Sequence, residues 1–228
     1  MSTTHYRLAF SLAALLCASP GQAAEAPAQK PAVPPVAVAA APWLQALPGV
    51  EAPVLKSKTT LRMKTTAGDV MIEVYPEAAP NAAARFIELA KNGFYKDTPV
   101  SRVVPGFVAQ FGINWRKQYK PWEDKHFKDD PSLFQLERGT LAFAKSGPDT
   151  NATQVFINYT ENNRLTVRSY NFTAFGKVVS GMEVVDKFAE VGEPGMGLDQ
   201  DELWNNGEAY LKALPIKPTM ILALELVK

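Results

Sequence analysis

The stretch that decides the fold is SRVVPGFVAQFG, residues 101–112. Its valines and phenylalanines favour β-strands, and Pro105-Gly106 is typical of a tight turn between two of them. Arg102 and Gln110 are the long polar side chains in this otherwise apolar pair of strands. Each of the two is either a structural hydrogen-bonding group or part of a functional site.

Strand signals continue on both sides of this stretch. Two alternating runs around Ala67-Gly68-Asp69 predict a β-hairpin. Further strand-like runs lie at 98–104, 107–112, 140–144, 154–158, 172–179 and 219–227.

Two segments carry apolar residues at helical spacing. The first is PNAAARFIELAKNGFY, residues 80–95, with Asn81 as the expected N-cap and Gly93 just beyond the helix end. The second is MEVVDKFAEV, residues 182–191. Many short strands with only two helices predict a closed barrel or a sandwich.

Composition narrows the class of protein. The chain has 228 residues, of which 46% are hydrophobic and 21% charged, enough to bury a core in one domain or at most two. Its formal net charge is only +1. A charge so close to neutral gives no reason to expect nucleic-acid binding or attachment to an anionic membrane.

The first residues are typical of an export signal. Residues 1–24 combine Arg7, an apolar run and small residues near a cleavage site, and the apolar run is too short to span a bilayer. We expect a signal peptide, no stable membrane insertion after its cleavage, and a periplasmic location, with secretion or lipid anchoring through Cys17 as alternatives. Because Cys17 is the sole cysteine, the mature chain would have no disulfide and no thiol nucleophile.

Residues 25–53 are dominated by alanine and proline. Proline at this density favours an extended, semi-rigid tether. We expect a linker here and the folded domain at 54–228, and we leave open whether Trp43 and Leu44 dock on that domain.

Several segments of the domain resemble one family. SRVVPGFVAQFG resembles the Arg-Val-Ile-Pro-Gly-Phe-x-x-Gln-Gly-Gly segment of the cyclophilins, the cyclophilin-type peptidyl-prolyl isomerases. GTLAFAKSGPDTNATQVFIN resembles their Gly-Thr-Leu-x-Met-Ala segment running on to Ser-Gln-Phe-Phe-Ile, and FGKVVSGMEVVDK is similar to their Phe-Gly-Lys-Val-x-x-Gly-Met-x-Val-Val-Asp. The resemblance covers residues 58–190 with the order kept, and the chain looks like an exported, bacterial-like member.

This resemblance implies an eight-stranded antiparallel β-barrel closed by two helices, with proline-containing peptides bound on its outer face. It also implies a peptidyl-prolyl cis-trans isomerase that needs no metal and no other cofactor. Its partners would be proline-containing peptides and unfolded or exported client proteins, and the chain would act as a monomer. A non-catalytic proline-peptide-binding or chaperone module on the same fold is the alternative.

The resemblance assigns site residues as well. Arg102, Phe107 and Gln110 would be catalytic. Arg102 would donate to the prolyl nitrogen, which gains a lone pair when the amide twists, and Gln110 would orient Arg102 or bond the substrate backbone. The proline pocket and the neighbouring groove would be lined by Val108, Ala144, Lys145, Gln154, Phe156, Leu165 and Phe172.

Each assignment has a structural alternative. The aromatic and aliphatic residues of the pocket fit a barrel core equally well. Arg102 is a reasonable half of a structural ion pair, and Gln110 a reasonable buried amide. His126 lies in a charged stretch typical of a solvated loop, so it is a poor ligand candidate. A hydrolase finds no support, because the mature chain lacks cysteine and His126 has no triad context.

Three places depart from the family pattern. Val100 and Ser101 stand where Phe-His is usual, so we expect weaker activity or altered substrate preference. Lys145 replaces a common asparagine, which matters little if only its backbone contacts substrate. Arg164 stands where animal members carry the tryptophan associated with cyclosporin binding, so we expect weak inhibition by cyclosporin.

The stretch 192–218 extends beyond the family's usual pattern. Its glycines, prolines and aspartates predict a loop, followed by a short helix around 207–214 and then the last strand. This extension either covers the groove or stabilises the barrel, and the sequence favours neither.

Overall fold

The predicted strands form one closed barrel in the computed structural model, which describes residues 44–167 and 169–227. The strands are β1 (Thr59–Thr65), β2 (Gly68–Val74), β3 (Thr98–Val104), β4 (Val108–Phe111), β5 (Thr140–Phe143), β6 (Val155–Asn158), β7 (Gly176–Ser180) and β8 (Met220–Leu226). Their order around the barrel is β1-β2-β7-β5-β6-β4-β3-β8, and β8 pairs antiparallel with both β1 and β3. The expectations for the signal peptide, Cys17 and Trp43 lie outside the described residues.

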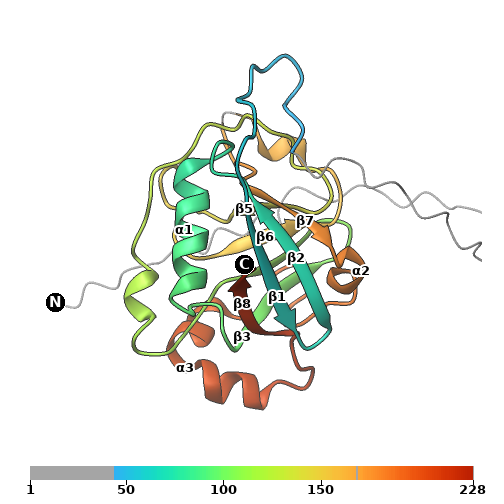
Figure 1. Cartoon of the computed structure of the whole chain (residues 1–228). Coiled ribbons are helices and arrows are strands. Elements are labelled where there is room, and N and C mark those ends of the chain that lie inside the picture. Colours follow the sequence, from blue (N-terminus) through green and yellow to red (C-terminus); the bar gives the residue numbers. More distant parts are fainter. Residues whose placement is uncertain (1–43, 168, 228) are drawn as a thin grey trace, which may run out of the picture. The chain divides into compact units, whose positions relative to one another are not determined.

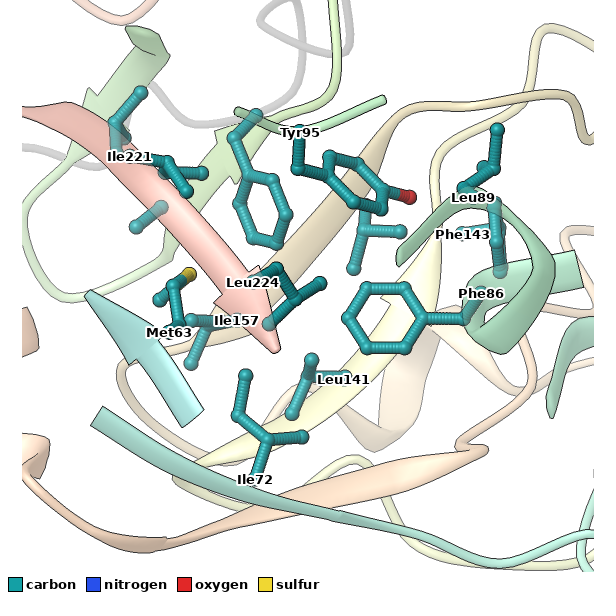
Figure 2. Close-up of a cluster of buried hydrophobic side chains, with 14 of the residues drawn as sticks. Met63, Ile72, Phe86, Leu89, Tyr95, Leu141, Phe143, Ile157, Ile221 and Leu224 are labelled. Carbon is teal, nitrogen blue, oxygen red and sulfur yellow. The ribbon is translucent and has the colours of Figure 1, made fainter. Parts of the chain in front are cut away.

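Alternation along the strands fills the barrel interior. Side chains of β1, β2, β5, β6 and β8 point inward, where Phe86 and Leu89 of a helix join them (Figure 2). Phe86 packs with its ring centroid 5.2 Å from that of Phe175 and 5.4 Å from that of Tyr95. Because one set of alternating positions is used for this core, the other set is free to build a surface on the outside of the barrel.

The helices are α1 (Pro80–Lys91), α2 (Met182–Val185) and α3 (Gln200–Ala213), with 3-10 turns at Lys120–Trp122 and Asn163–Leu165. Figure 1 shows α1 along one side of the barrel and α3 at its lower end. No helix in the described ranges is long and apolar enough to cross a membrane.

The start of α1 corrects one prediction. Asn81 is not the N-cap, because Pro80 is already the first helical residue and no side chain at the cap position bonds the helix. Asp130, far along the chain, takes this role instead: its carboxylate accepts from the backbone N–H groups of Asn81 at 3.2 Å and Ala82 at 2.9 Å. At the other end Gly93 has a φ of 68°, as expected for the residue just past a helix.

The two later helices differ in length from the predicted ones. Only the first turn of the run 182–191 is helical, and the Ala189 N–H donates to the Thr219 hydroxyl at 3.0 Å. In contrast α3 starts at Gln200, where the Asp199 side chain caps it by accepting from the Glu202 N–H at 2.9 Å. The non-helical backbone of Asn206 (φ −131°, ψ 23°) divides α3, and its second part begins where the helix at 207–214 was predicted.

Part of the expected linker packs on the barrel. Leu44 is buried, and the Leu47 N–H donates to the Leu133 carbonyl at 2.9 Å. The Gln135 N–H donates to the Gln45 carbonyl at 2.7 Å. The docking of Leu44 that the sequence left open is therefore present in the structure.

Candidate active site

Strand register builds a row of side chains on the outside of the barrel. Arg102 on β3 lies opposite Gln110 on β4, and Gln110 lies opposite Phe156 on β6. Phe156 in turn lies opposite Ala142 on β5. Paired residues point to the same face of a sheet, and Phe111, next to Gln110, points into the core. The four paired residues therefore share the outer face.

Arg102 is held in place by uncharged partners. Its Nε donates to the Gly195 carbonyl at 2.8 Å, and its Nη1 donates to the Gln110 Oε1 at 3.4 Å. Its guanidinium carbon lies 5.8 Å from the centroid of the Phe107 ring. Partial burial lowers the pKa of Arg102, but a guanidinium starts so far above neutrality that it remains charged. Within the described residues Arg102 forms no ion pair, which argues against the structural alternative.

A chain of side-chain amides continues from Gln110. Its Nε2 donates to the Oε1 of Gln154 at 2.8 Å, and the Nε2 of Gln154 donates to the Oε1 of Gln200 at 2.9 Å. Gln110 is only 9% exposed, whereas Gln200 at the start of α3 is exposed. The chain thus runs from the floor of the site to the protein surface.

Apolar residues form a second cluster outside the barrel core, which we call the outer cluster. Its buried members are Leu44, Tyr75, Ala78, Phe107, Val108, Phe134, Leu136, Ala142, Phe156, Leu165, Phe172 and Ala174. Phe156 and Phe172 meet edge to face with ring centroids 5.6 Å apart. The four residues predicted for the proline pocket belong to this cluster, as does Phe172, predicted to bind substrate: Phe107, Val108, Phe156, Leu165 and Phe172. They are buried, as the structural alternative requires, but in a place separate from the barrel core.

A second guanidinium contacts the same aromatic ring. Arg164 is exposed, and its guanidinium carbon lies 5.3 Å from the Phe107 ring centroid. Phe107 therefore has cation–π contacts with both Arg102 and Arg164.

Lys145 has a buried, ion-paired side chain and a solvent-exposed main chain. Its side chain is 4% exposed, and its Nζ donates to the Asp129 Oδ2 at 2.5 Å and to the Asn171 carbonyl at 3.1 Å. The solvent-exposed part of this residue is therefore its backbone. Beside it, the Ala144 N–H donates to the Gln154 carbonyl at 2.8 Å, so these three predicted groove residues are neighbours.

Comparison with known proteins identifies the family. Residues 60–205 match the family model described as cyclophilin type peptidyl-prolyl cis-trans isomerase/CLD. The chain belongs to the cyclophilin-type peptidyl-prolyl isomerases. A peptidyl-prolyl cis-trans isomerase of Acinetobacter baylyi is 37% identical over 149 residues, which cover 64% of this chain and 79% of the relative. Peptidyl-prolyl cis-trans isomerase B of Escherichia coli is 31% identical, over 60% of this chain and 88% of its own.

Solved structures confirm the fold of this cyclophilin. A cyclophilin type peptidyl-prolyl cis-trans isomerase from Cryptosporidium parvum superposes with a TM-score of 0.57 at 21% identity, covering 75% of this chain and 99% of that one. The same enzyme was also solved in the presence of the dipeptide Ala-Pro, with a TM-score of 0.56 to this chain. The predicted eight-stranded barrel and the predicted isomerase family are both confirmed.

The C-terminal extension predicted at 192–218 contacts the candidate site directly, and its first part, up to residue 205, lies within the family match and not beyond it. The Leu198 N–H donates to the Ser101 carbonyl at 2.8 Å, one residue before Arg102. Gly197 has a φ of 82° and lies so close to β3 that a Cβ would be 2.5 Å from the Ser101 carbonyl oxygen. Sequence reasoning missed Gly195 and its carbonyl bond to Arg102, since the Gly-Pro-rich composition indicates a loop but not its contacts.

Two further sequence expectations concern groups outside this row. His126 is exposed, in agreement with a solvated loop. Within the part of the chain that the structure describes, no three His, Cys, Asp or Glu side chains are grouped to hold a metal ion.

The two residues before Arg102, which depart from the family pattern, are both buried. Val100 lies in the barrel core, and Ser101 is 2% exposed with its hydroxyl 3.3 Å from the Gln110 carbonyl.

Proposed function

We propose that this cyclophilin isomerises X-Pro bonds of exported proteins, with Arg102 stabilising the twisted amide beside the outer cluster. One observation carries the proposal. Arg102 is held at Nε by Gly195 and at Nη1 by Gln110, while its Nη2 makes no hydrogen bond within the described residues. A fixed cation with a free donor suits a nitrogen that becomes a hydrogen-bond acceptor only in the transition state.

The energetics require more than this one group. Rotation about a peptide bond must cross about 18–20 kcal/mol, because the planar amide loses its resonance. An acceleration of about four to five decades needs roughly 5.5–7 kcal/mol. One charge-assisted hydrogen bond contributes about 1.5–3 kcal/mol, so Arg102 alone falls short.

The outer cluster supplies the remaining contribution in this proposal. Phe107, Phe156 and Leu165 offer apolar contacts that would fix the proline ring while the residue before it rotates. Gln110 would hold the Arg102 guanidinium within hydrogen-bonding distance of the prolyl nitrogen. The surface beside Ala144 and Lys145 would receive the residues that precede proline. The Cryptosporidium cyclophilin was solved in the presence of Ala-Pro, a dipeptide of the same chemical class.

Exchange NMR on a short X-Pro peptide tests the catalytic part of the proposal. We expect fast cis-trans exchange with the wild-type protein and a loss of about 10- to 150-fold in Arg102→Ala, the equivalent of one charge-assisted hydrogen bond. Peptide binding should persist, because the apolar contacts remain. If Arg102→Ala exchanges the peptide as fast as wild type, the assigned role of Arg102 is wrong.

The export part of the proposal rests on the sequence of residues 1–24, which lie outside the described residues. We propose cleavage of this segment, a periplasmic location and action as a monomer on unfolded client proteins. Cell fractionation with N-terminal sequencing of the recovered protein tests the first two, and sedimentation of the mature protein tests the third. Recovery in the cytoplasm with residues 1–24 intact would exclude the export role.

A second candidate function is a non-catalytic proline-peptide-binding or chaperone module. Ser101 favours it, because this buried serine stands where the family usually carries histidine, and the loop residue Leu198 is bonded to its carbonyl. The same NMR experiment separates the two functions. Peptide shifts without accelerated exchange would identify a binding module.

A further inference from the structure

We propose that Gln200, on the C-terminal extension, positions Arg102 through Gln110 and Gln154. This inference rests on the proposed role of Arg102 in catalysis. Gln200 is the first residue of α3 and lies outside the strands that build the site. The inference therefore assigns the C-terminal extension a role in catalysis. Gln200 touches no reacting atom in this proposal and is therefore a positioning residue.

The chemistry of Arg102 fixes the direction of the whole amide chain. A guanidinium only donates hydrogen bonds, so the Gln110 side chain must turn its oxygen toward Arg102 and its NH₂ group away. That NH₂ then requires the oxygen of Gln154, which leaves the Gln154 NH₂ pointing outward. The chain can end only on an acceptor, and the Oε1 of Gln200 is that acceptor at 2.9 Å.

The weakest contact in the chain is the one at Arg102. Its Nη1 lies 3.4 Å from the Gln110 oxygen, whereas the two amide–amide contacts are 2.8 and 2.9 Å. Gln110 is therefore held more firmly from the Gln154 side than from the Arg102 side. A donor at position 200 in place of the acceptor would favour the reversed orientation of both amides and would turn an NH₂ group toward the Arg102 cation.

The segment that carries Gln200 is anchored at both ends. Gly195 accepts from the Arg102 Nε at 2.8 Å, and Leu198 bonds the backbone of β3. After Gln200, Leu203 and Trp204 of α3 are buried in the barrel's main hydrophobic cluster. One segment thus holds Arg102 directly through a main-chain carbonyl and indirectly through the amide chain.

Three substitutions at position 200 test the direction of the chain. Gln200→Met has the same length but no acceptor, Gln200→Glu keeps the acceptor, and Gln200→Lys supplies only donors. We expect Gln200→Met to lower kcat by about two- to tenfold, the loss of one ordinary hydrogen bond, with KM little changed. Gln200→Glu should restore most of kcat, and Gln200→Lys should lower it the most. Gln118→Met, on an exposed loop, is the matched control with wild-type kcat.

A second readout does not depend on activity. The side-chain amide resonances of Gln110 and the Nε–H resonance of Arg102 should shift in Gln200→Met and Gln200→Lys, and return toward wild type in Gln200→Glu. Equal kcat in the Met, Glu and Lys variants, or unmoved Gln110 and Arg102 resonances, would overturn the inference. If Arg102→Ala is fully active, the proposed function fails as well; if only the Gln200 variants behave as wild type, the inference alone is wrong.

Discussion

Replacing Gly197 with alanine separates a catalytic role of the C-terminal loop from a purely structural one. The φ of Gly197 is 82°, and an added Cβ would lie 2.5 Å from the Ser101 carbonyl oxygen and 2.6 Å from the Arg102 Cβ. An L-residue in this backbone region costs about 1–2 kcal/mol. Relieving contacts this short costs roughly another 1–3 kcal/mol, as overpacking does. We expect the free energy of unfolding to fall by about 2–5 kcal/mol.

Activity should fall together with stability in Gly197→Ala. To accept the methyl group, the loop and the Arg102 backbone must separate, which lengthens the bond from Arg102 Nε to the Gly195 carbonyl. A misplacement of about 1 Å in a catalytic group costs about 100-fold in rate. For a smaller displacement we expect kcat/KM to fall roughly 10- to 100-fold.

Gly49→Ala is the control for backbone strain alone. Gly49 has a φ of 74° and no atom within 4 Å of an added Cβ. It should lose at most about 1–2 kcal/mol of stability and keep full activity. Urea unfolding and exchange NMR on both variants give the comparison. Equal losses of stability in the two variants would mean that the loop at Gly197 moves aside without a measurable free-energy penalty. A fully active Gly197→Ala would refute the positioning of Arg102 by this loop.

Three further outcomes follow from the structure. Lys145→Met should lower the free energy of unfolding by about 3 kcal/mol in urea titrations, because it leaves the largely buried Asp129 carboxylate without its cation, and a loss under about 1 kcal/mol would contradict this. Burial raises the pKa of Asp130 above its unfolded value, so the folded protein binds more protons above about pH 4 and stability attributable to this group falls as the pH rises through that window. Asp130→Asn should remove this slope from urea titrations at several pH values, and an unchanged slope would speak against it. Arg164→Trp should strengthen inhibition by cyclosporin, since it supplies the missing aromatic ring; equal inhibition of both proteins would mean that other positions decide.

The sequence predicted the parts of the site that depend on strand alternation and on the motif around Pro105-Gly106. Arg102, Gln110 and Phe156 were placed on short strands, and antiparallel register then puts their side chains on one face. The strand assignment needs only the local pattern, whereas the pairing of Gln110 with Phe156 joins strands far apart in the chain and comes from the structure. Their roles toward a substrate stay predictions.

The parts that sequence missed depend on contacts between distant segments. The Asp130 carboxylate caps α1 from 48 positions further along the chain. The sequence pattern predicted Asn81 instead, because a helix is usually capped by a polar residue next to its own start. The hydrogen bond from Arg102 to Gly195 joins residues 93 positions apart. Its acceptor is a main-chain carbonyl, which every residue has, so the residue type at position 195 could not predict this bond. From the sequence, Gln200 could be described only as a polar residue ahead of a predicted helix, and its bond to Gln154 could not be predicted.

The position of β8 between β1 and β3 has a consequence for the synthesis of the chain. Until Met220–Leu226 has left the ribosome, β1 and β3 lack a shared neighbour, and the sheet remains open at two edges. Open edges are templates for pairing with other chains, so an unfinished or truncated product is at risk of aggregation. Removing the last nine residues would leave every residue of the row from Arg102 to Ala142 in the chain and still deprive that row of a closed barrel.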